Sequence, residues 1–168
     1  PDCTGRDVII VDFSYKRDVM LTLAEEANSV LVIDHHKTAE ESLVDLPANV
    51  ECHFDMNHSG AMLTWIHCFP NEDPPALLKH IEDRDLWRFE LSGTRAIQAS
   101  LFSYPYDFGV WDDLMKTGVG ILEYEGQVLE RKHFKDIGEL LKVTKRIMII
   151  GGHEVEVANL PYTMSSDA

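Results

Sequence analysis

Positive charge is scarce in this 168-residue sequence, which has 15 lysine and arginine residues against 29 aspartate and glutamate residues. The resulting formal net charge of −14 argues against a protein that grips long nucleic acid through a broad basic face. An acidic chain can still act on short phosphorylated molecules when a bound metal supplies positive charge locally. The charge balance therefore favours small partners over long polymers.

Cysteine is also scarce, with three residues and no C-x-x-C pair. An odd number of widely spaced cysteines argues against a disulfide framework and favours a reduced, cytoplasmic setting. No apolar run approaches the roughly 18–20 residues that a membrane span needs. No basic segment followed by an apolar one opens the chain as a secretory signal would. The start at Pro1 predicts a fragment of a longer protein.

The composition, 45% hydrophobic and 26% charged residues, is typical of a globular protein with one sizeable core at this length. We expect an α/β fold with a Rossmann-like parallel sheet flanked by helices, followed by a helical linker and the start of a second small α/β region. The expected division is an α/β domain over 1–105, a helical connector over 106–145 and a hairpin region over 146–168.

The clearest pattern is a strand–helix–strand unit in the first 36 residues. Asp7–Phe13 is an apolar run rich in β-branched residues, typical of a strand buried on both faces, and Ser29–Ile33 is a second such run. Apolar residues at helical spacing predict a helix over Tyr15–Asn28, with Ser14 as its N-cap. The two strands should therefore be parallel, with a right-handed crossover.

Weaker signals extend the fold beyond this unit. Apolar periodicity and turn residues predict one more strand, two short helices, a longer helical region and a hairpin. In chain order these are a strand over Val50–Phe54, a helix capped by Ser59 and ending at Cys68, a helix over Ala76–Glu82 behind Pro74 and Pro75, helices over Asp107–Thr144, and a hairpin around Gly151-Gly152. Glycines at 118, 120, 126 and 138 predict that the helical region is broken into two or more helices.

Ligand-binding side chains should gather at the carboxyl edge of the parallel sheet. Asp12 follows the first strand, and Asp34, His35 and His36 follow the second. Neighbouring strands lie about 5 Å apart, so a carboxylate and an imidazole can reach one cation, and this donor mixture suits Mn²⁺, Mg²⁺, Fe²⁺ or Zn²⁺. Adjacent histidines face opposite ways on an extended chain, so one is a ligand candidate and its neighbour a contact for an anion. For an aspartate at a strand end taken alone, the alternative is a helix cap or turn residue. For the His35-His36 pair taken alone, the alternative is a solvated loop.

A further acidic cluster, Glu82-Asp-Arg-Asp85, ends the helix predicted to start at Ala76. Acidic side chains at a helix C-terminus interact unfavourably with the helix dipole, so a compensating partner is expected, and a cation is the simplest one. The alternative is a solvated helix end at which Arg84 pairs with Asp83 and Asp85.

Four segments together resemble the DHH phosphoesterase superfamily. Val32-Ile-Asp-His-His-Lys-Thr-Ala39 is similar to its name-giving motif, and Ile10–Ser14 is similar to its second motif. His58–Met62 resembles the small-residue segment that follows the tripeptide, and Glu82–Arg88 resembles the fourth motif. The likeness keeps the family's order and spacing over roughly residues 6–105.

The resemblance implies a phosphoesterase that uses two Mn²⁺ ions in the complete protein, with Mg²⁺ as the alternative. A bridging hydroxide would attack short oligonucleotides or small phosphorylated nucleotides. The metal ligands implied in this chain are Asp12, His35 and Asp85, with Asp83 as the reserve for Asp85. The implied catalytic residues are His36, at the phosphate or behind the ligands, and Asp34, which would orient the two histidines.

Basic and aromatic side chains are candidates for contacts with the substrate. The basic candidates for stabilising charge on the phosphoryl oxygens are Lys37, Arg84 and Arg95. Residues such as Lys37 and Arg95 are more often solvated on the surface than in contact with a substrate. Aromatic rings could stack a base, although positions in the core or at its rim fit the pattern better. The aromatic candidates are Trp87, Phe89 and Tyr104.

The sequence departs from the family at its first motif, a histidine and two aspartates that has no counterpart in the eleven residues before Asp12. Gly151-Gly152-His153 is reminiscent of the family's Gly-Gly-Gly-His segment, but its position favours a hairpin turn. Three readings remain open: an enzyme whose first motif precedes Pro1, a degenerate binding or scaffold protein, and a mononuclear hydrolase that uses Asp12, His35 and Asp85. The sequence predicts no membrane partner and leaves the oligomeric state open, a homodimer included.

Overall fold

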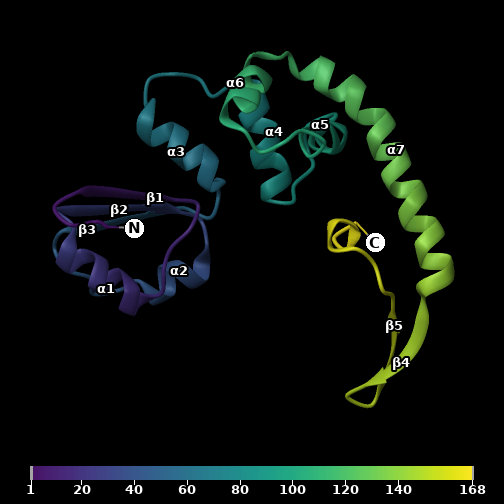
Figure 1. The fold of residues 1–168 in the computed structure, drawn as a ribbon, viewed down its shortest axis with the longest axis horizontal. Coiled ribbons are helices and arrows are strands. Elements are labelled where there is room, and N and C mark those ends of the chain that lie inside the picture. Colours follow the sequence, from purple (N-terminus) through teal and green to yellow (C-terminus); the bar gives the residue numbers. More distant parts are fainter. Residues whose placement is uncertain (1, 168) are drawn as a thin grey trace. The chain divides into compact units, whose positions relative to one another are not determined.

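The computed structural model describes residues 2–167 and divides into two compact units, with the boundary between Thr94 and Arg95. The first unit holds a three-stranded parallel sheet flanked by helices (Figure 1). The second holds three helices and a two-stranded antiparallel sheet. The predicted α/β class is therefore confirmed.

The strand–helix–strand unit predicted at the start of the chain is present. Strand β1 (Asp7–Val11), helix α1 (Arg17–Glu26) and strand β2 (Ser29–Asp34) follow one another, and β1 pairs with β2 in parallel. The N-cap predicted at Ser14 is wrong, because the helix begins later and Lys16 is its N-cap. The chain needs residues 12–16 to cross from the end of β1 to the face of the sheet that α1 covers.

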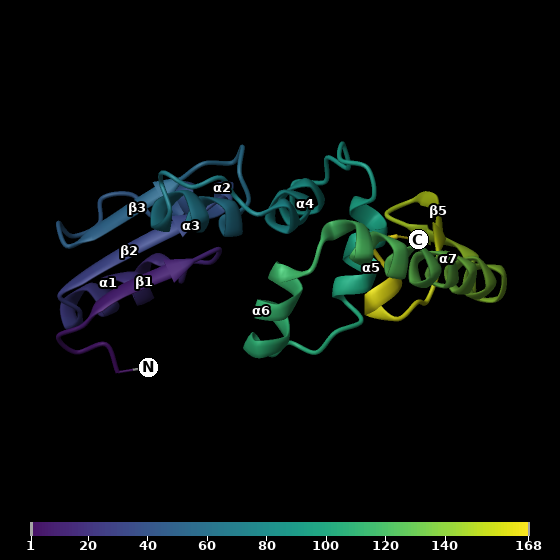
Figure 2. The same cartoon turned by 90° about the horizontal axis from the view of Figure 1, so that it is seen from above.

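Strand β2 lies at the centre of the sheet, between β1 and the predicted third strand, β3 (Val50–Phe54). Its burial follows from this position, since α1 packs on one face and α3 (Gly60–Cys68) contacts the sheet as well. Figures 1 and 2 show α1 and the short helix α2 (Lys37–Ser42) beside the three strands. The core on the α1 side consists of Cys3, Met20, Ala27, Val30, Val32 and Leu43.

Burial of β1 on both faces, as its apolar run predicts, is wrong. The strand is an edge of the sheet, and Ile9 and Val11 are 61% and 44% exposed. Val8 and Ile10, on the other face, pack against the α1 core. A continuous apolar run thus accompanies one covered face and one largely exposed face, which run length alone does not distinguish.

Two further helices complete the first unit. Ser59 caps α3 as predicted, because its hydroxyl oxygen accepts a hydrogen bond from the Met62 amide at 3.1 Å. Helix α4 (Ala76–Asp85) also forms as predicted and continues three residues past Glu82. Helix α3 contacts β1, β2 and α4. These contacts bring the end of α4 toward the carboxyl edge of the sheet.

The second unit contains α5 (Thr94–Leu101), α6 (Phe108–Lys116) and α7 (Val119–Thr144). The two helices predicted over 107–144 are therefore present, but the predicted breaks at glycines 120, 126 and 138 are wrong. At Gly126 the glycine serves close packing instead, because a Cβ there would lie 1.7 Å from the carbonyl oxygen of Ala96. That approach is available only to glycine.

The predicted hairpin follows α7 and consists of β4 (Arg146–Ile150) and β5 (His153–Val157). Gly151 and Gly152 form its two-residue turn with φ angles of 61° and 87°, the left-handed conformation that such turns require. A short 3₁₀ turn, Tyr162–Met164, follows. Within residues 2–167, none of the helices has the length and apolar character needed to cross a bilayer.

Candidate metal centre

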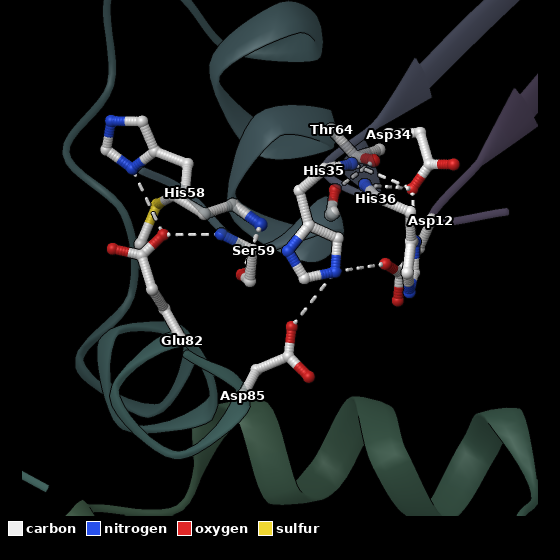
Figure 3. A network of polar contacts seen from close by, with 11 residues as sticks. Asp12, Asp34, His35, His36, His58, Ser59, Thr64, Glu82 and Asp85 are labelled. Atoms are coloured by element: carbon white, nitrogen blue, oxygen red, sulfur yellow. Dashed lines mark hydrogen bonds and ion pairs between the residues drawn. The ribbon is translucent and has the colours of Figure 1, made fainter. Parts of the chain in front are cut away.

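Four polar residues meet at the carboxyl edge of the sheet, as the order of the strands predicts. Asp12 follows β1, Asp34 ends β2, and His35 and His36 come directly after it (Figure 3). One ligand atom from each of the four lies within 4.8 Å of the others. We call these four residues, together with Asp85 at the end of α4, the Asp–His cluster.

His35 lies between two carboxylates. Its Nε2 is 3.2 Å from Asp12 Oδ1 and 3.5 Å from Asp85 Oδ2, and its side chain is only 13% exposed. One imidazole nitrogen carries at most one proton, so it cannot donate fully to both carboxylates. Two acidic groups facing one ring nitrogen therefore form a donor set that a shared cation would balance.

Asp34 is fully buried, and its two carboxylate oxygens differ in their partners. Oδ1 accepts hydrogen bonds from the His35 amide at 2.7 Å and the His36 amide at 3.3 Å, and it contacts His36 Nδ1 at 2.7 Å. Oδ2 is buried without a hydrogen-bond partner. A buried carboxylate oxygen left in this way is costly unless something satisfies it, so the residues present fit a bound cation.

The electrostatics of the cluster follow from this crowding. Partial burial raises the pKa of Asp12, and the negative charge of Asp85 raises it further. The hydrogen bond to Asp34 raises the pKa of His36, because the carboxylate favours the protonated ring. Negative charge is thus concentrated beside His35, whereas positive charge is favoured on the more exposed ring of His36.

Gly60 determines how closely Asp12 can approach α3. A Cβ at Gly60 would lie 2.2 Å from Asp12 Oδ1 and 2.5 Å from Asp12 Cβ and Cγ. Asp12 itself has a φ of 55°, which turns its side chain out of the path of β1 while its amide still donates to the Ile33 carbonyl at 2.9 Å. The sequence pointed to this segment only through the resemblance of His58–Met62 to a family motif, so the contact itself was missed.

Glu82 holds the start of α3 in place from α4. Its Oε2 accepts a hydrogen bond from the Ser59 amide at 3.0 Å and lies 3.1 Å from His58 Nδ1 (Figure 3). Arg88 Nη1 is 3.7 Å from the other oxygen. Protein groups therefore compensate this buried acid, which is neither the cation nor the solvated helix end that the sequence offered as alternatives. Glu82 and Asp85, three residues apart on a helix, share a face, and this spacing is the signal that could have separated them from Asp83.

Asp83 is buried and closes the loop that follows α4. Its carboxylate accepts hydrogen bonds from the amides of Glu90 at 2.8 Å and Leu91 at 3.1 Å, and from the Thr94 hydroxyl at 2.5 Å. The proposed surface pairing of Asp83 with Arg84 does not describe this buried side chain. Of the two acids considered for the fourth motif, Asp85 is the one that the structure brings to His35.

We expect Asp83→Asn to destabilise the first unit by about 2–3 kcal/mol, since the amide offers one acceptor oxygen where the carboxylate offers two. Burial raises the pKa of Asp83, but the hydrogen bonds from Thr94, Glu90 and Leu91 outweigh it, and the net shift is downward. The carboxylate therefore contributes stability that is complete above about pH 4 and is lost as the pH falls through its lowered pKa. Urea unfolding across this range measures both effects. The exposed Asp73→Asn is the matched control, and equal stability of the two variants would contradict the prediction.

The three basic candidates have different surroundings. Lys37 opens α2 with its side chain 76% exposed, and its Nζ lies 3.8 Å from Glu41. Arg95 belongs to the second unit, where its Nη1 lies 3.7 Å from Asp167. Arg84 precedes Asp85 in α4 and is thus the basic candidate that shares an element with the cluster.

These features define an α/β unit with a carboxylate–imidazole cluster at the carboxyl edge of its sheet. No protein-family model matches the chain, and no solved structure matches it. Among curated proteins, the chain is 32% identical over 115 residues to an uncharacterized protein of Acanthamoeba polyphaga mimivirus. The match covers 68% of this chain but 27% of the viral protein, so the chain spans about a quarter of the length of that relative.

Proposed function

We propose that the first unit carries metal ligands of a DHH-type phosphohydrolase that cleaves short oligonucleotides or small phosphorylated nucleotides. The observation that carries the proposal is the position of His35 Nε2, 3.2 Å from Asp12 and 3.5 Å from Asp85. The partnerless buried oxygen of Asp34 supports it further. The segments that resemble the family's motifs are the ones that supply these side chains.

Asp12, His35 and Asp85 would hold the metal, and the free oxygen of Asp34 is available beside them. Mixed carboxylate and imidazole donors suit Mn²⁺, with Mg²⁺ as the alternative. When bound, the metal would supply Lewis acidity toward a phosphoryl oxygen and make water a stronger acid. In the whole protein we propose two such ions, the second completed by side chains equivalent to the family's first motif.

The remaining residues of the cluster act on charge and orientation. Asp34 Oδ1 fixes the ring of His36 through Nδ1 and receives the amides of both histidines, so it sets the direction of the two rings. The raised pKa of His36 favours the imidazolium, which can stabilise negative charge on a phosphate. Asp34 is thus a positioning residue, and His36 is the group proposed to contact the substrate.

The test has two stages. Calorimetric titration of the chain with Mn²⁺ should show saturable binding that EDTA reverses. The complete gene product is then assayed with Mn²⁺ on a 5′-phosphorylated dinucleotide, a cyclic dinucleotide, a nucleoside bisphosphate and inorganic polyphosphate. Hydrolysis of a base-bearing substrate is the expected result.

Each other outcome decides between the readings. Mn²⁺ binding without hydrolysis of any of the four substrates would favour the binding or scaffold protein over the enzyme. No Mn²⁺ binding by the folded chain would contradict the metal centre itself. Hydrolysis that persists in EDTA would contradict the role of the metal.

A further inference from the structure

Exposed aromatic rings follow two of the proposed metal ligands. Phe13 comes directly after Asp12, is 50% exposed and makes an edge-to-face contact with Tyr15, with the ring centroids 4.9 Å apart. Trp87 comes two residues after Asp85, is 54% exposed and makes the same kind of contact with Phe89 at 5.0 Å. Each ligand of the cluster that approaches His35 is thus followed by an exposed, braced ring.

The backbone that displays Trp87 is strained. Among the non-glycine residues of the described chain, 2–167, positive φ occurs at Asp12, Asp45, Trp87 and Phe89, and the two aromatic residues have values of 56° and 52°. A bulky residue in this left-handed region costs about 1–2 kcal/mol. This conformation belongs to the end of α4, where the Trp87 amide donates to the Arg84 carbonyl and the Arg88 amide donates to the Asp83 carbonyl, the hydrogen-bond pair of a Schellman motif.

A strained tryptophan that is half exposed gains little from burial. The sequence favoured a core or rim position for Trp87, Phe89 and Tyr104, and Phe89 is partly buried while Tyr104 donates to Glu125 in the second unit. Trp87 departs from that expectation. Because its ring is half exposed on the segment that supplies Asp85, Trp87 is available for contact with a ligand.

We infer that Trp87 and Phe13 are stacking platforms for the bases of a short nucleotide whose phosphate lies at the Asp–His cluster. The inference rests on the proposed function and adds to it the two side chains that would hold the bases of the substrate. Consecutive Cα atoms are about 3.8 Å apart, so Phe13 and Trp87 lie within one or two residues' reach of the ligands that would hold the metal. Both rings therefore belong to the short segments that supply Asp12 and Asp85, next to which a base joined to a phosphate at the cluster would lie.

The net charge of the chain is consistent with substrate binding through local contacts such as stacking. A net charge of −14 offers little general attraction for a phosphate backbone, so binding must come from local contacts. Stacking on an aromatic ring supplies such a contact for any base, because every base has a π-face. Removal of one platform should weaken binding of a dinucleotide by roughly 5- to 100-fold.

The test measures binding of a dinucleotide of two adenosines that carries a 5′-phosphate and is joined by a phosphorothioate linkage, which slows hydrolysis. Titrations with and without Mn²⁺ follow affinity by calorimetry and stacking by quenching of tryptophan fluorescence, with inorganic phosphate as the probe without a base. Trp87→Gly is the main variant, because glycine adopts a φ of 56° without steric cost and the fold should be retained. Trp87→Phe restores a ring, Phe13→Leu removes the second platform, and Tyr124→Ala removes an exposed ring on α7 as the control.

We expect the dinucleotide to quench the fluorescence of the unmodified chain and inorganic phosphate to leave it unchanged. Trp87→Gly and Phe13→Leu should bind the dinucleotide more weakly, while Trp87→Phe and Tyr124→Ala should bind it nearly as the unmodified chain does, all with unchanged Mn²⁺ affinity. Unchanged dinucleotide affinity in Trp87→Gly, or an equal loss for inorganic phosphate, would overturn the inference. Failure of Mn²⁺ binding in the unmodified chain would overturn the proposed function instead, and the metal-free titration still decides the stacking.

Discussion

Replacement of His35 by alanine should lower the affinity of the chain for Mn²⁺ by roughly 100-fold or more, since even residues that only support a metal ligand contribute 10- to 100-fold. His35 Nε2 contacts both carboxylates, at 3.2 Å from Asp12 Oδ1 and 3.5 Å from Asp85 Oδ2. Without the imidazole, the two carboxylates lose their common partner and face each other across the gap. Calorimetric titration with Mn²⁺ measures the loss.

A matched control is available within the same sheet. His53 in β3 also contacts a carboxylate, with its Nε2 2.7 Å from Glu51, but it is exposed and lies outside the Asp–His cluster. His53→Ala should therefore keep the Mn²⁺ affinity of the unmodified chain. Equal affinities of the two variants would contradict the assignment of His35 as a ligand.

Thermal unfolding gives a second, independent measurement of the same variant. A ligand that binds only the folded state stabilises it by about 2.7 kcal/mol when its concentration is 100 times the dissociation constant. Mn²⁺ should thus raise the unfolding midpoint of the unmodified chain and of His53→Ala. It should leave the midpoint of His35→Ala nearly unchanged at the same concentration.

The parts of the fold that sequence reasoning predicted are those that depend on local patterns. The β-branched runs of β1 and β2 and the apolar spacing of α1 predicted a parallel strand–helix–strand unit, and this topology places Asp12 beside Asp34 and His35. Strand order then predicted one edge of the sheet as the place for the cluster. No knowledge of distant contacts was needed for that step.

The parts that sequence reasoning missed depend on contacts between distant segments. Whether β1 is an edge or an inner strand depends on what pairs with it, and its apolar run is compatible with both. In the sequence, Gly126 predicts a break in the helix. Only the structure shows that glycine is needed there because the Ala96 carbonyl packs against it. Asp83 and Asp85 look equivalent in sequence, and only the loop that folds back over Asp83 separates a buried structural acid from the acid that faces His35.

Gly60→Ala should weaken Mn²⁺ binding at the metal centre by displacing Asp12. The new Cβ would lie 2.2 Å from Asp12 Oδ1, and Asp12 Cβ and Cγ are within 2.5 Å, so the whole carboxylate must move. Because Asp12 is about half exposed, it can move toward solvent, away from His35. We expect Mn²⁺ affinity to fall by about 10- to 100-fold, in the range that loss of a supporting contact produces.

Stability should fall by about 1–3 kcal/mol, because Asp12 Cβ, which the backbone fixes, would lie 2.5 Å from the new Cβ and the backbone must shift to relieve the overlap. Gly138→Ala is the matched control, since it lies within α7 and a Cβ there meets nothing within 4 Å. That control should keep full Mn²⁺ affinity and gain about 0.5–1 kcal/mol of stability. Unchanged Mn²⁺ affinity in Gly60→Ala would contradict the close approach of Gly60 to Asp12.

A double-mutant cycle separates an effect through Asp12 from a general disturbance of α3. If the added methyl group acts only by displacing Asp12, Gly60→Ala should cause no further loss of Mn²⁺ affinity in a chain that already carries Asp12→Gly, which removes both the carboxylate and the Cβ that the methyl group would meet and fits the φ of 55°. If instead it displaces α3 and the Ser59–Glu82 contact, the two losses should add. Because Ser59 and Gly60 are neighbours at the start of one helix, the cycle shows whether the helix end positions Asp12 or merely tolerates it, and the first outcome is the one that the 2.2 Å approach predicts.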